Sequence, residues 1–203
     1  PSNYRSICIQ NPFAKVFSSI LTKRLSDFAE ENDLLPIFQF GFRAKRSTTA
    51  AAALLYEVAR SRLDEGRRTY VAYVDFSKAF DRVNRPLLFH KLQLLGIPSQ
   101  FCQSLNFIFN STKFFIKSGN FFTHPYTSNV GVPQGDPISP ILFNLFIHDL
   151  PSSLHHNGIE LNGVRVHYIQ YADDLCIIAE SEEDLQRGLD NLNRYCHEHF
   201  IEV

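Results

Sequence analysis

Residues 168–179 have the sequence YIQYADDLCIIA, in which two apolar runs flank a pair of adjacent carboxylates, Asp173 and Asp174. Such runs on both sides of a short polar turn predict an antiparallel hairpin, with strands over residues 164–171 and 175–179. Two anions at the tip of an apolar hairpin repel each other and lose hydration, which costs free energy. An ordinary turn is one interpretation of the pair, because Asp is a common turn residue.

A third carboxylate changes that interpretation. Residues 69–76 (TYVAYVDF) are β-branched and aromatic and predict another buried strand, with Asp75 interrupting the apolar run at its end. If the strand ends lie side by side, three carboxylates converge at one sheet edge, which is stable only with cations between the oxygens. Mg²⁺ prefers such ligands together with substrate phosphates, and two Mg²⁺ ions can activate a hydroxyl and stabilise a leaving phosphate. The aspartates therefore predict a site for nucleotidyl transfer.

Outside these strands the apolar residues recur mostly at helical spacing. We expect helices over residues 13–30, 48–63, 86–95, 98–109, 139–150 and 182–200. A polar, basic loop covers residues 39–49, and Ser118-Gly119-Asn120 predicts a further hairpin between residues 113–117 and 121–127. Because helices and hairpins alternate without a regular strand–helix–strand rhythm, the expected fold class is α+β.

The charge is unevenly distributed over the 203 residues, of which 44% are apolar and 20% charged. This composition excludes a disordered tail or a coiled coil, and the net charge of -1 argues against nucleic-acid binding through bulk charge. Residues 1–72 contain 11 Lys and Arg against 7 Asp and Glu, whereas residues 73–203 contain 9 against 14. A basic first third and an acidic remainder indicate an anion site in one part and a cation site in the other.

No segment has the roughly 20 consecutive apolar residues of a membrane span, and the N-terminus lacks an apolar signal core. We therefore expect a soluble, intracellular protein with no membrane partner. Its four cysteines form no close pair and are expected to be buried free thiols.

Five short motifs occur in order along the chain. They are YRSI (residues 4–7), QFGFR (39–43), VDFSKAFDRV (74–83), GVPQGDPISP (131–140) and YADD (171–174). Together they resemble the reverse transcriptase domain of non-LTR retrotransposons, of the long interspersed element type, and the resemblance covers nearly the whole chain. Group II intron reverse transcriptases are close relatives and stay an alternative.

The resemblance implies a right-hand polymerase fold. Fingers would cover residues 1–70, and a palm would cover residues 71–203, with a small antiparallel sheet backed by helices. The chain would end before the thumb, so we do not expect processive synthesis by this segment alone.

The resemblance also implies a role for each carboxylate. Asp75 and Asp173 would bind two Mg²⁺ ions, for which Mn²⁺ is a possible substitute, and Asp174 would complete the catalytic cluster. The backbone carbonyl of Phe76 would add a ligand. Phe80, with Ala79 beside it in the dNTP pocket, matches the aromatic gate that excludes a ribose 2′-hydroxyl, although core packing is an alternative or additional role for this ring.

Further residues would contact the nucleotide and the nucleic acid. Arg43 and Arg46 match the loop that grips the triphosphate, because a guanidinium suits phosphate geometry, and the alternative is a solvated basic loop. Gln134 and Gly135 match the nucleotide pocket. Possible template or duplex contacts are Arg5, Lys45, Lys113 and Lys117, with a structural salt bridge equally compatible with Arg5. The aromatic residues Phe101, Phe107, Phe109, Phe114 and Phe115 are expected in the core rather than in a base-stacking stripe.

The implied activity is RNA-directed DNA synthesis, in which the 3′-hydroxyl of a DNA primer attacks a dNTP on an RNA template. A thumb, an endonuclease and other parts of a parent polyprotein would be partners, in a ribonucleoprotein of the nucleus and cytoplasm. A catalytically silent RNA-binding scaffold and an RNA-dependent RNA polymerase are the alternatives. Retention of all three aspartates speaks against the scaffold, because a scaffold has no need of a costly anion cluster. An aromatic gate favours dNTPs.

Overall fold

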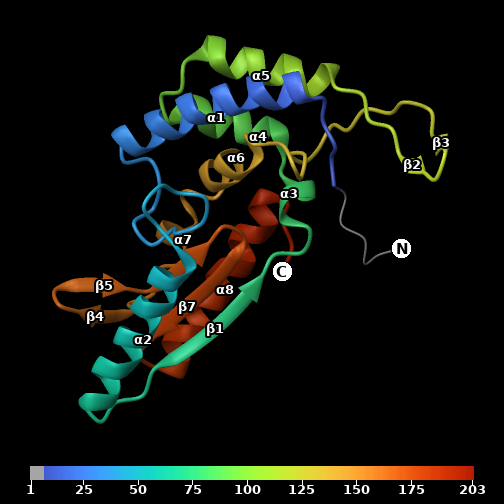
Figure 1. Ribbon diagram of the computed structural model, residues 1–203. Helices are drawn as coiled ribbons and strands as arrows, with labels where there is room; N and C mark the ends of the chain where they lie inside the picture. The colour runs from blue at the N-terminus through green and yellow to red at the C-terminus, as the bar shows by residue number, and fades with distance from the viewer. Residues whose placement is uncertain (1–6) are drawn as a thin grey trace.

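A computed structural model of the chain describes residues 7–203 (Figure 1). The helices are α1 (Pro12–Glu31), α2 (Thr48–Asp64), α3 (Ala79–Arg82), α4 (Arg85–Leu94), α5 (Ser99–Ser111), α6 (Ser139–Phe146), α7 (Leu150–Ser153) and α8 (Glu182–His199). The strands are β1 (Tyr70–Asp75), β2 (Lys117–Ser118), β3 (Phe121–Phe122), β4 (Ile159–Leu161), β5 (Val164–Val166), β6 (Tyr168–Tyr171) and β7 (Asp174–Ala179). Across residues 7–203 no helix is long and apolar enough to cross a membrane.

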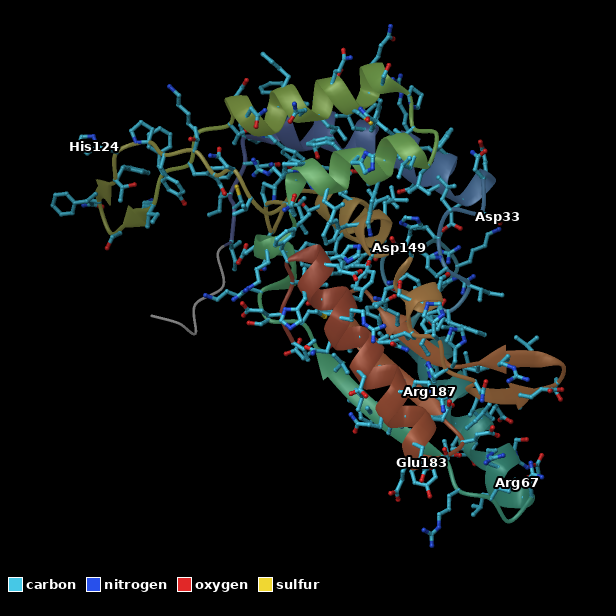
Figure 2. The ribbon with its side chains drawn as sticks, turned by 180° about the vertical axis from the view of Figure 1, so that it is seen from behind. Asp33, Arg67, His124, Asp149, Glu183 and Arg187 are labelled. Atoms are coloured by element: carbon cyan, nitrogen blue, oxygen red, sulfur yellow. The ribbon has the colours of Figure 1, made fainter. Side chains whose placement is uncertain are left out.

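The central sheet has three antiparallel strands in the order β1-β7-β6. β7 lies in the middle because its residues from Leu175 to Ala179 are all apolar, and each of them is buried. Helix α8 packs against β7 and β1 and covers one face of the sheet, as Figures 1 and 2 show from opposite sides. The sheet is thus built around one fully apolar strand.

The prediction of a buried strand over residues 69–76 is wrong for β1, which lies at the edge of the sheet. Tyr73 is 77% exposed and Asp75 is also exposed, whereas Val74 between them is buried. Alternation along the strand therefore places Tyr73 and Asp75 on an open face and Val74 on a covered face. An aromatic and β-branched run has the same composition whether a strand is central or at the edge. The composition therefore predicts a strand but not its burial.

The segment 38–40 extends the sheet beyond β6, although its sequence predicts a polar loop. The backbone N–H of Phe40 donates to the carbonyl of Gln170 at 2.7 Å, and the N–H of Gln170 donates to the carbonyl of Phe38 at 2.9 Å. Gln39 and Gln170 consequently form a parallel bridge. This bridge attaches the N-terminal part of the chain to the edge of the central sheet.

The predicted helices are confirmed within a few residues at each end, with one exception. The expected helix 139–150 is divided into α6 and α7, and Pro151 lies in the first turn of α7, where proline is tolerated because its missing N–H needs no partner.

The expected strand 164–171 is divided into β5 and β6, because β5 pairs with β4 rather than with the central sheet. The turn between β4 and β5 is Asn162-Gly163, and both residues have positive φ, as an Asn-Gly hairpin turn requires. That dipeptide is a sequence signal for a hairpin here, although β4 is absent from the predicted strands.

The thiol prediction is confirmed for Cys102, Cys176 and Cys196, which are free and buried, while Cys8 is free and half-buried. Burial raises the pKa of Cys176 to about 11. Such thiols are poor nucleophiles at neutral pH.

A partly buried ion pair holds α8 against the rest of the fold. The Nζ of Lys91 donates to Asp149 Oδ1 at 2.6 Å and to the carbonyl of Phe146 at 2.8 Å, and the hydroxyl of Tyr195 on α8 donates to the same Asp149 oxygen at 2.7 Å. Figure 2 shows Asp149 beside α8. Burial opposes the charge on Asp149, but the hydrogen bonds from Lys91 and Tyr195 outweigh it and lower the pKa of Asp149.

Replacing Lys91 by Met is expected to reduce the free energy of unfolding, because Asp149 loses its cation while half-buried. We expect a loss of about 2 kcal/mol in urea unfolding at pH 7, below the value for a fully buried pair.

The effect should depend on pH. Because the pKa of Asp149 lies below its ordinary 3.8 in the folded state, the contribution of its carboxylate to stability is present above that pH and is lost as the pH falls through the folded value. The difference between Lys91→Met and the wild type should therefore shrink in acid. Lys23→Met is the control, since Lys23 forms an exposed pair with Asp27 and should leave stability unchanged. An equal effect of both substitutions would contradict the assignment.

Candidate active site

The ends of β1 and β7 bring two carboxylates together. Asp75 is the last residue of β1, Asp174 is the first residue of β7, and the two are direct partners in the antiparallel register. Directly paired residues project on the same face, so both side chains lie on the open face that Tyr73 shares. The strand ends therefore lie side by side, as the sequence argument requires.

Asp173 occupies the two-residue turn between β6 and β7, next to Asp174. The preceding turn residue, Ala172, has a φ of 56°, a left-handed conformation that is uncommon for alanine. In the part of the chain that the structure describes, no group of three or more His, Cys, Asp or Glu side chains is arranged to hold a metal ion. The structure thus provides an open pair of carboxylates with a third in the adjoining turn.

Gln39 holds that turn in place. Its side chain is buried, and its Oε1 accepts hydrogen bonds from the N–H of Ala172 at 2.9 Å and from the N–H of Gly41 at 2.8 Å. One amide oxygen therefore joins the QFGFR and YADD motifs. The sequence predicts no role for Gln39, because its position in the motif is the only available signal.

Gly41 packs directly on the turn. A Cβ at Gly41 would lie 2.3 Å from the backbone nitrogen of Ala172, so no side chain fits there. The amide of Asn144, which is buried in α6, donates to the carbonyl of Gly41 at 2.8 Å. The turn that carries Asp173 is therefore supported from two elements distant in sequence.

Phe80 lies in α3, shortly after Asp75. Its half-exposed ring stacks on Phe143 of α6 with 4.9 Å between the centroids, and its carbonyl accepts a hydrogen bond from Val132 at 2.8 Å. The neighbouring Ala79 is buried. Packing of Phe80 is thus a property of the structure, and the ring keeps an exposed part that a nucleotide could meet.

The loop 131–137 contacts the segment before α1. The carbonyl of Gln134 accepts a hydrogen bond from the N–H of Cys8 at 2.7 Å. Gly135 has a φ of 99°, and a Cβ there would lie 2.8 Å from the carbonyl oxygen of Cys8. The close approach that requires glycine at this position is therefore made by the protein's own backbone.

Asp136, for which the sequence predicts no role, anchors this loop. The carboxylate is buried and accepts hydrogen bonds from the hydroxyl of Ser18 on α1, the amide of Gln10 and the N–H of Ile138. These bonds tie the loop to α1. A residue with partners this far away in sequence leaves no local pattern.

The basic loop differs from the expectation at Arg43. Its guanidinium forms a bidentate pair with Glu30, with N–O distances of 2.8 and 2.6 Å, and also donates to the carbonyl of Pro36. The Arg43 side chain is only 8% exposed. The hydrogen bonds from Arg43 lower the pKa of Glu30. The structure therefore gives Arg43 a structural partner instead of an open position for a triphosphate.

Arg46 and Lys45 are more accessible. Arg46 is half-buried, donates to the carbonyl of Ile37, and lies over the ring of Phe40 at 5.3 Å, and burial lowers its pKa. Lys45 is exposed and has a φ of 61°. Of the predicted triphosphate contacts, Arg46 is the one that the structure leaves half-exposed.

The remaining predictions concern the nucleic-acid contacts and the aromatic residues expected in the core, and their outcomes differ. Arg5 lies outside the described residues, and Lys113 and Lys117 are exposed around β2. The expectation of core packing holds for Phe109, which is buried, but is wrong for Phe107 and Phe115, which are 72% and 56% exposed. Phe107 lies on the outer side of an amphipathic helix, and Phe115 lies in the exposed segment that leads into β2.

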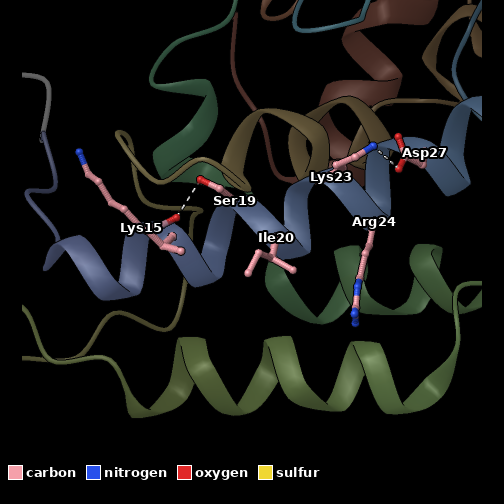
Figure 3. Close-up of a pocket in the computed structure, with 7 residues that line it drawn as sticks. Lys15, Ser19, Ile20, Lys23, Arg24 and Asp27 are labelled. Carbon is pink, nitrogen blue, oxygen red and sulfur yellow. Dashed lines mark hydrogen bonds and ion pairs between the residues drawn. The ribbon is translucent and has the colours of Figure 1, made fainter.

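A cavity of about 580 Å³ along α1 is separate from these residues (Figure 3). It is lined by Lys15, Val16, Ser19, Ile20, Lys23, Arg24 and Asp27. None of them is a predicted site residue, and Lys23 and Asp27 neutralise each other at 2.7 Å. This cavity is therefore not the candidate active site.

Comparisons with known proteins agree with this geometry. Over residues 1–203 the sequence matches the family described as "Reverse transcriptase (RNA-dependent DNA polymerase)". The "Probable RNA-directed DNA polymerase from transposon BS" of Drosophila melanogaster is 28% identical over 100% of this chain and 23% of its own length. The "RNA-directed DNA polymerase from mobile element jockey" of Drosophila funebris is 27% identical over 93% of this chain and 21% of its own length. The chain thus spans less than a quarter of these relatives.

A solved structure supports the fold. The apo telomerase from Candida tropicalis has a TM-score of 0.67 at 12% identity, over 92% of this chain and 34% of that chain. This likeness confirms the predicted α+β fold of the right-hand polymerase type. The boundary between fingers and palm near residue 70 stays a prediction.

Replacing Gln39 by Leu is expected to destabilise the turn that carries Asp173, because two buried N–H groups lose their acceptor. We expect the free energy of unfolding to fall by about 2 kcal/mol or more. Hydrogen exchange at the amide of Ala172 should become faster. Gln93→Leu on the exposed side of α4 is the control and should change neither quantity. Unchanged exchange at Ala172 in Gln39→Leu would contradict this role.

Proposed function

Because this chain belongs to the reverse transcriptase family, as its five ordered motifs predict, we propose that it performs RNA-templated DNA synthesis. The reaction transfers a nucleotide from a dNTP to the 3′-hydroxyl of a DNA primer. The pairing of Asp75 with Asp174 is the observation that carries the proposal. It puts two carboxylates on one open face, where a primer end and a triphosphate have access.

The metal ligands in this proposal are Asp75, Asp173 and Asp174, together with the carbonyl of Phe76. Mg²⁺ is usually held by one or two carboxylates, and waters and substrate phosphates complete its shell. An open pair of carboxylates at the strand ends leaves room for such waters and phosphates, whereas a site enclosed by protein ligands would not. When bound, two Mg²⁺ ions supply activation of the primer hydroxyl and neutralisation of the charge on the phosphates.

Selection of the nucleotide is assigned to the residues around Phe80. The exposed part of its ring would collide with a ribose 2′-hydroxyl, while the rest of the ring packs on Phe143. Ala79, Gln134 and Gly135 would shape the pocket. We assign the triphosphate to Arg46, with Lys45 nearby, and leave Arg43 with Glu30.

A catalytically silent scaffold is less compatible with the sheet. Like charges at paired positions of an antiparallel sheet are destabilising, and Asp75 and Asp174 are such a pair. A scaffold gains nothing from this repulsion, whereas an enzyme that binds cations between the carboxylates does.

The wider setting follows from the relatives. One relative named above comes from a transposon and other matching relatives come from retrotransposable elements, so we propose a retrotransposon rather than a group II intron as the source. We propose that the chain acts with an RNA template, a DNA primer, a thumb and an endonuclease, as part of a ribonucleoprotein in the nucleus and cytoplasm.

Replacing Asp173 by Asn is expected to reduce primer extension on an RNA template by at least about 100-fold, because losing a metal ligand should exceed the 10–100-fold effect of outer-shell partners. Mn²⁺ binding, followed by electron paramagnetic resonance, should weaken in the same variant. Asp33→Asn, an exposed residue after α1, is the control and should match the wild type. Full extension by Asp173→Asn would refute the proposal.

Replacing Phe80 by Ala is expected to raise ribonucleotide incorporation relative to dNTP incorporation by about tenfold, since a missing ring no longer excludes the 2′-hydroxyl. Phe143→Leu separates this effect from packing, because it removes the stacking partner and leaves the gate. That variant should lose about 1–2 kcal/mol of stability and keep its preference for dNTPs. The gate assignment fails if both variants change sugar selectivity equally.

A further inference from the structure

The hairpin of β2 and β3 presents large apolar side chains to solvent. Phe115, Ile116, Phe121, Phe122 and Tyr126 are 56%, 57%, 81%, 66% and 46% exposed. In Figures 1 and 2 the hairpin projects from the body after α5, with His124 labelled on it in Figure 2. Exposed apolar side chains gathered in one place mark binding surfaces more often than single exposed residues do.

The register divides these residues between two faces. Lys117 is the direct partner of Phe122, and Ser118 is the direct partner of Phe121. The Nζ of Lys117 lies 5.9 Å from the centroid of the Phe122 ring. One face thus carries a cation beside an exposed ring, while the opposite face carries a ring beside a hydroxyl.

The pairing continues for one further bond, in which the N–H of Thr123 donates to the carbonyl of Ile116 at 3.0 Å. Beyond it the register shifts by one residue, because Phe114 pairs with Tyr126. Alternation along the strands is therefore followed only as far as Lys117 and Phe122. We call the side of the hairpin that carries Lys117 and Phe122 the aromatic–basic face.

The surrounding charge favours a polyanion. Residues 82–135 contain no Asp or Glu, although the chain as a whole has 21 of them, and the hairpin region contributes Lys113 and Lys117. Open rings next to cations suit a single-stranded nucleic acid, because bases stack on the rings and phosphates pair with the cations. An apolar protein partner would not explain the absence of acids.

The base of the hairpin is fixed beside the candidate active site. The N–H of Gly131 donates to the carbonyl of Val83 at 2.8 Å, and the N–H of Val132 donates to the carbonyl of Phe80 at 2.8 Å. The buried guanidinium of Arg85 donates to the carbonyls of Gly131 and Ser128. The segment that follows the hairpin is thus attached to the backbone of α3 and of Val83.

We propose that the aromatic–basic face binds single-stranded template RNA, with a base stacked on Phe122 and a phosphate paired with Lys117. This inference rests on the proposed polymerase function and specifies where the uncopied template lies. It also replaces the duplex contact expected for Lys117 by a contact with a single strand.

Fluorescence anisotropy of a labelled 12-nucleotide RNA with the complete 203-residue chain tests the proposal. Phe122→Ala should weaken binding by about tenfold, since stacking on one aromatic ring is worth that order of affinity. Phe121→Ala is the matched control, because it removes a neighbouring and equally accessible ring from the opposite face, and it should change affinity by less than about twofold. Lys117→Ala should weaken binding and reduce its salt dependence by roughly one phosphate contact.

Each outcome decides the proposal. Equal losses in Phe121→Ala and Phe122→Ala overturn the assignment of the face, and no loss in either overturns the hairpin as a binding surface. A Phe122→Ala loss as large for duplex RNA as for single-stranded RNA also overturns it. Primer extension is measured alongside: if it depends on Asp173 while Phe122→Ala binds RNA normally, the inference fails and the proposed function stands. Thermal melting confirms folding of each variant.

Discussion

Two like charges face each other where β1 meets β7, and the structure depends on how that repulsion is overcome. Opposed carboxylates such as Asp75 and Asp174 weaken a strand pair by up to about 1 kcal/mol. β7 continues from Asp174 into five residues, Leu175 to Ala179, that are all buried. Burial of a single large apolar side chain contributes about 1.5–3 kcal/mol, so the core outweighs the repulsion several times. The strands hold the carboxylates together, and the carboxylates need contribute nothing to folding.

The turn beside them is held by different means. A turn with a left-handed alanine has little intrinsic preference for its conformation, and Ala172 would be free to relax if only β6 and β7 flanked it. Gln39 prevents this through one oxygen that accepts from both Ala172 and Gly41. Because Gly41 has no Cβ, the two backbones touch. The QFGFR and YADD motifs are therefore one structural unit, although more than 120 residues separate them.

The features that the sequence predicts are those with a local cause. An apolar run that stops at Asp75 and another that starts after Asp174 mark strand ends, and two such ends can be expected to meet. Arg43 shows the opposite case, because its partner Glu30 lies on α1 and nothing in the loop distinguishes an arginine paired with a carboxylate from one that awaits a phosphate. The buried positions of Gln39 and Asp136 cannot be predicted from the sequence either, since a polar residue in a loop-like segment is ordinarily solvated.

Net charge counted by region does not locate the binding sites, because it too omits contacts between residues distant in sequence. Part of the basic excess in residues 1–72 is used within the protein, since Arg43 pairs with Glu30 and the buried Arg62 donates to the carbonyl of Arg68. The acidic remainder contains an acid-free stretch, residues 82–135, in which Lys113 and Lys117 are exposed around the hairpin. The segment that follows the hairpin returns to α3, where the N–H of Val132 donates to the carbonyl of Phe80 and the N–H of Gly131 donates to that of Val83. A regional charge count contains neither the pairing that removes Arg43 from the available cations nor this return of the chain, because both depend on contacts between residues distant in sequence.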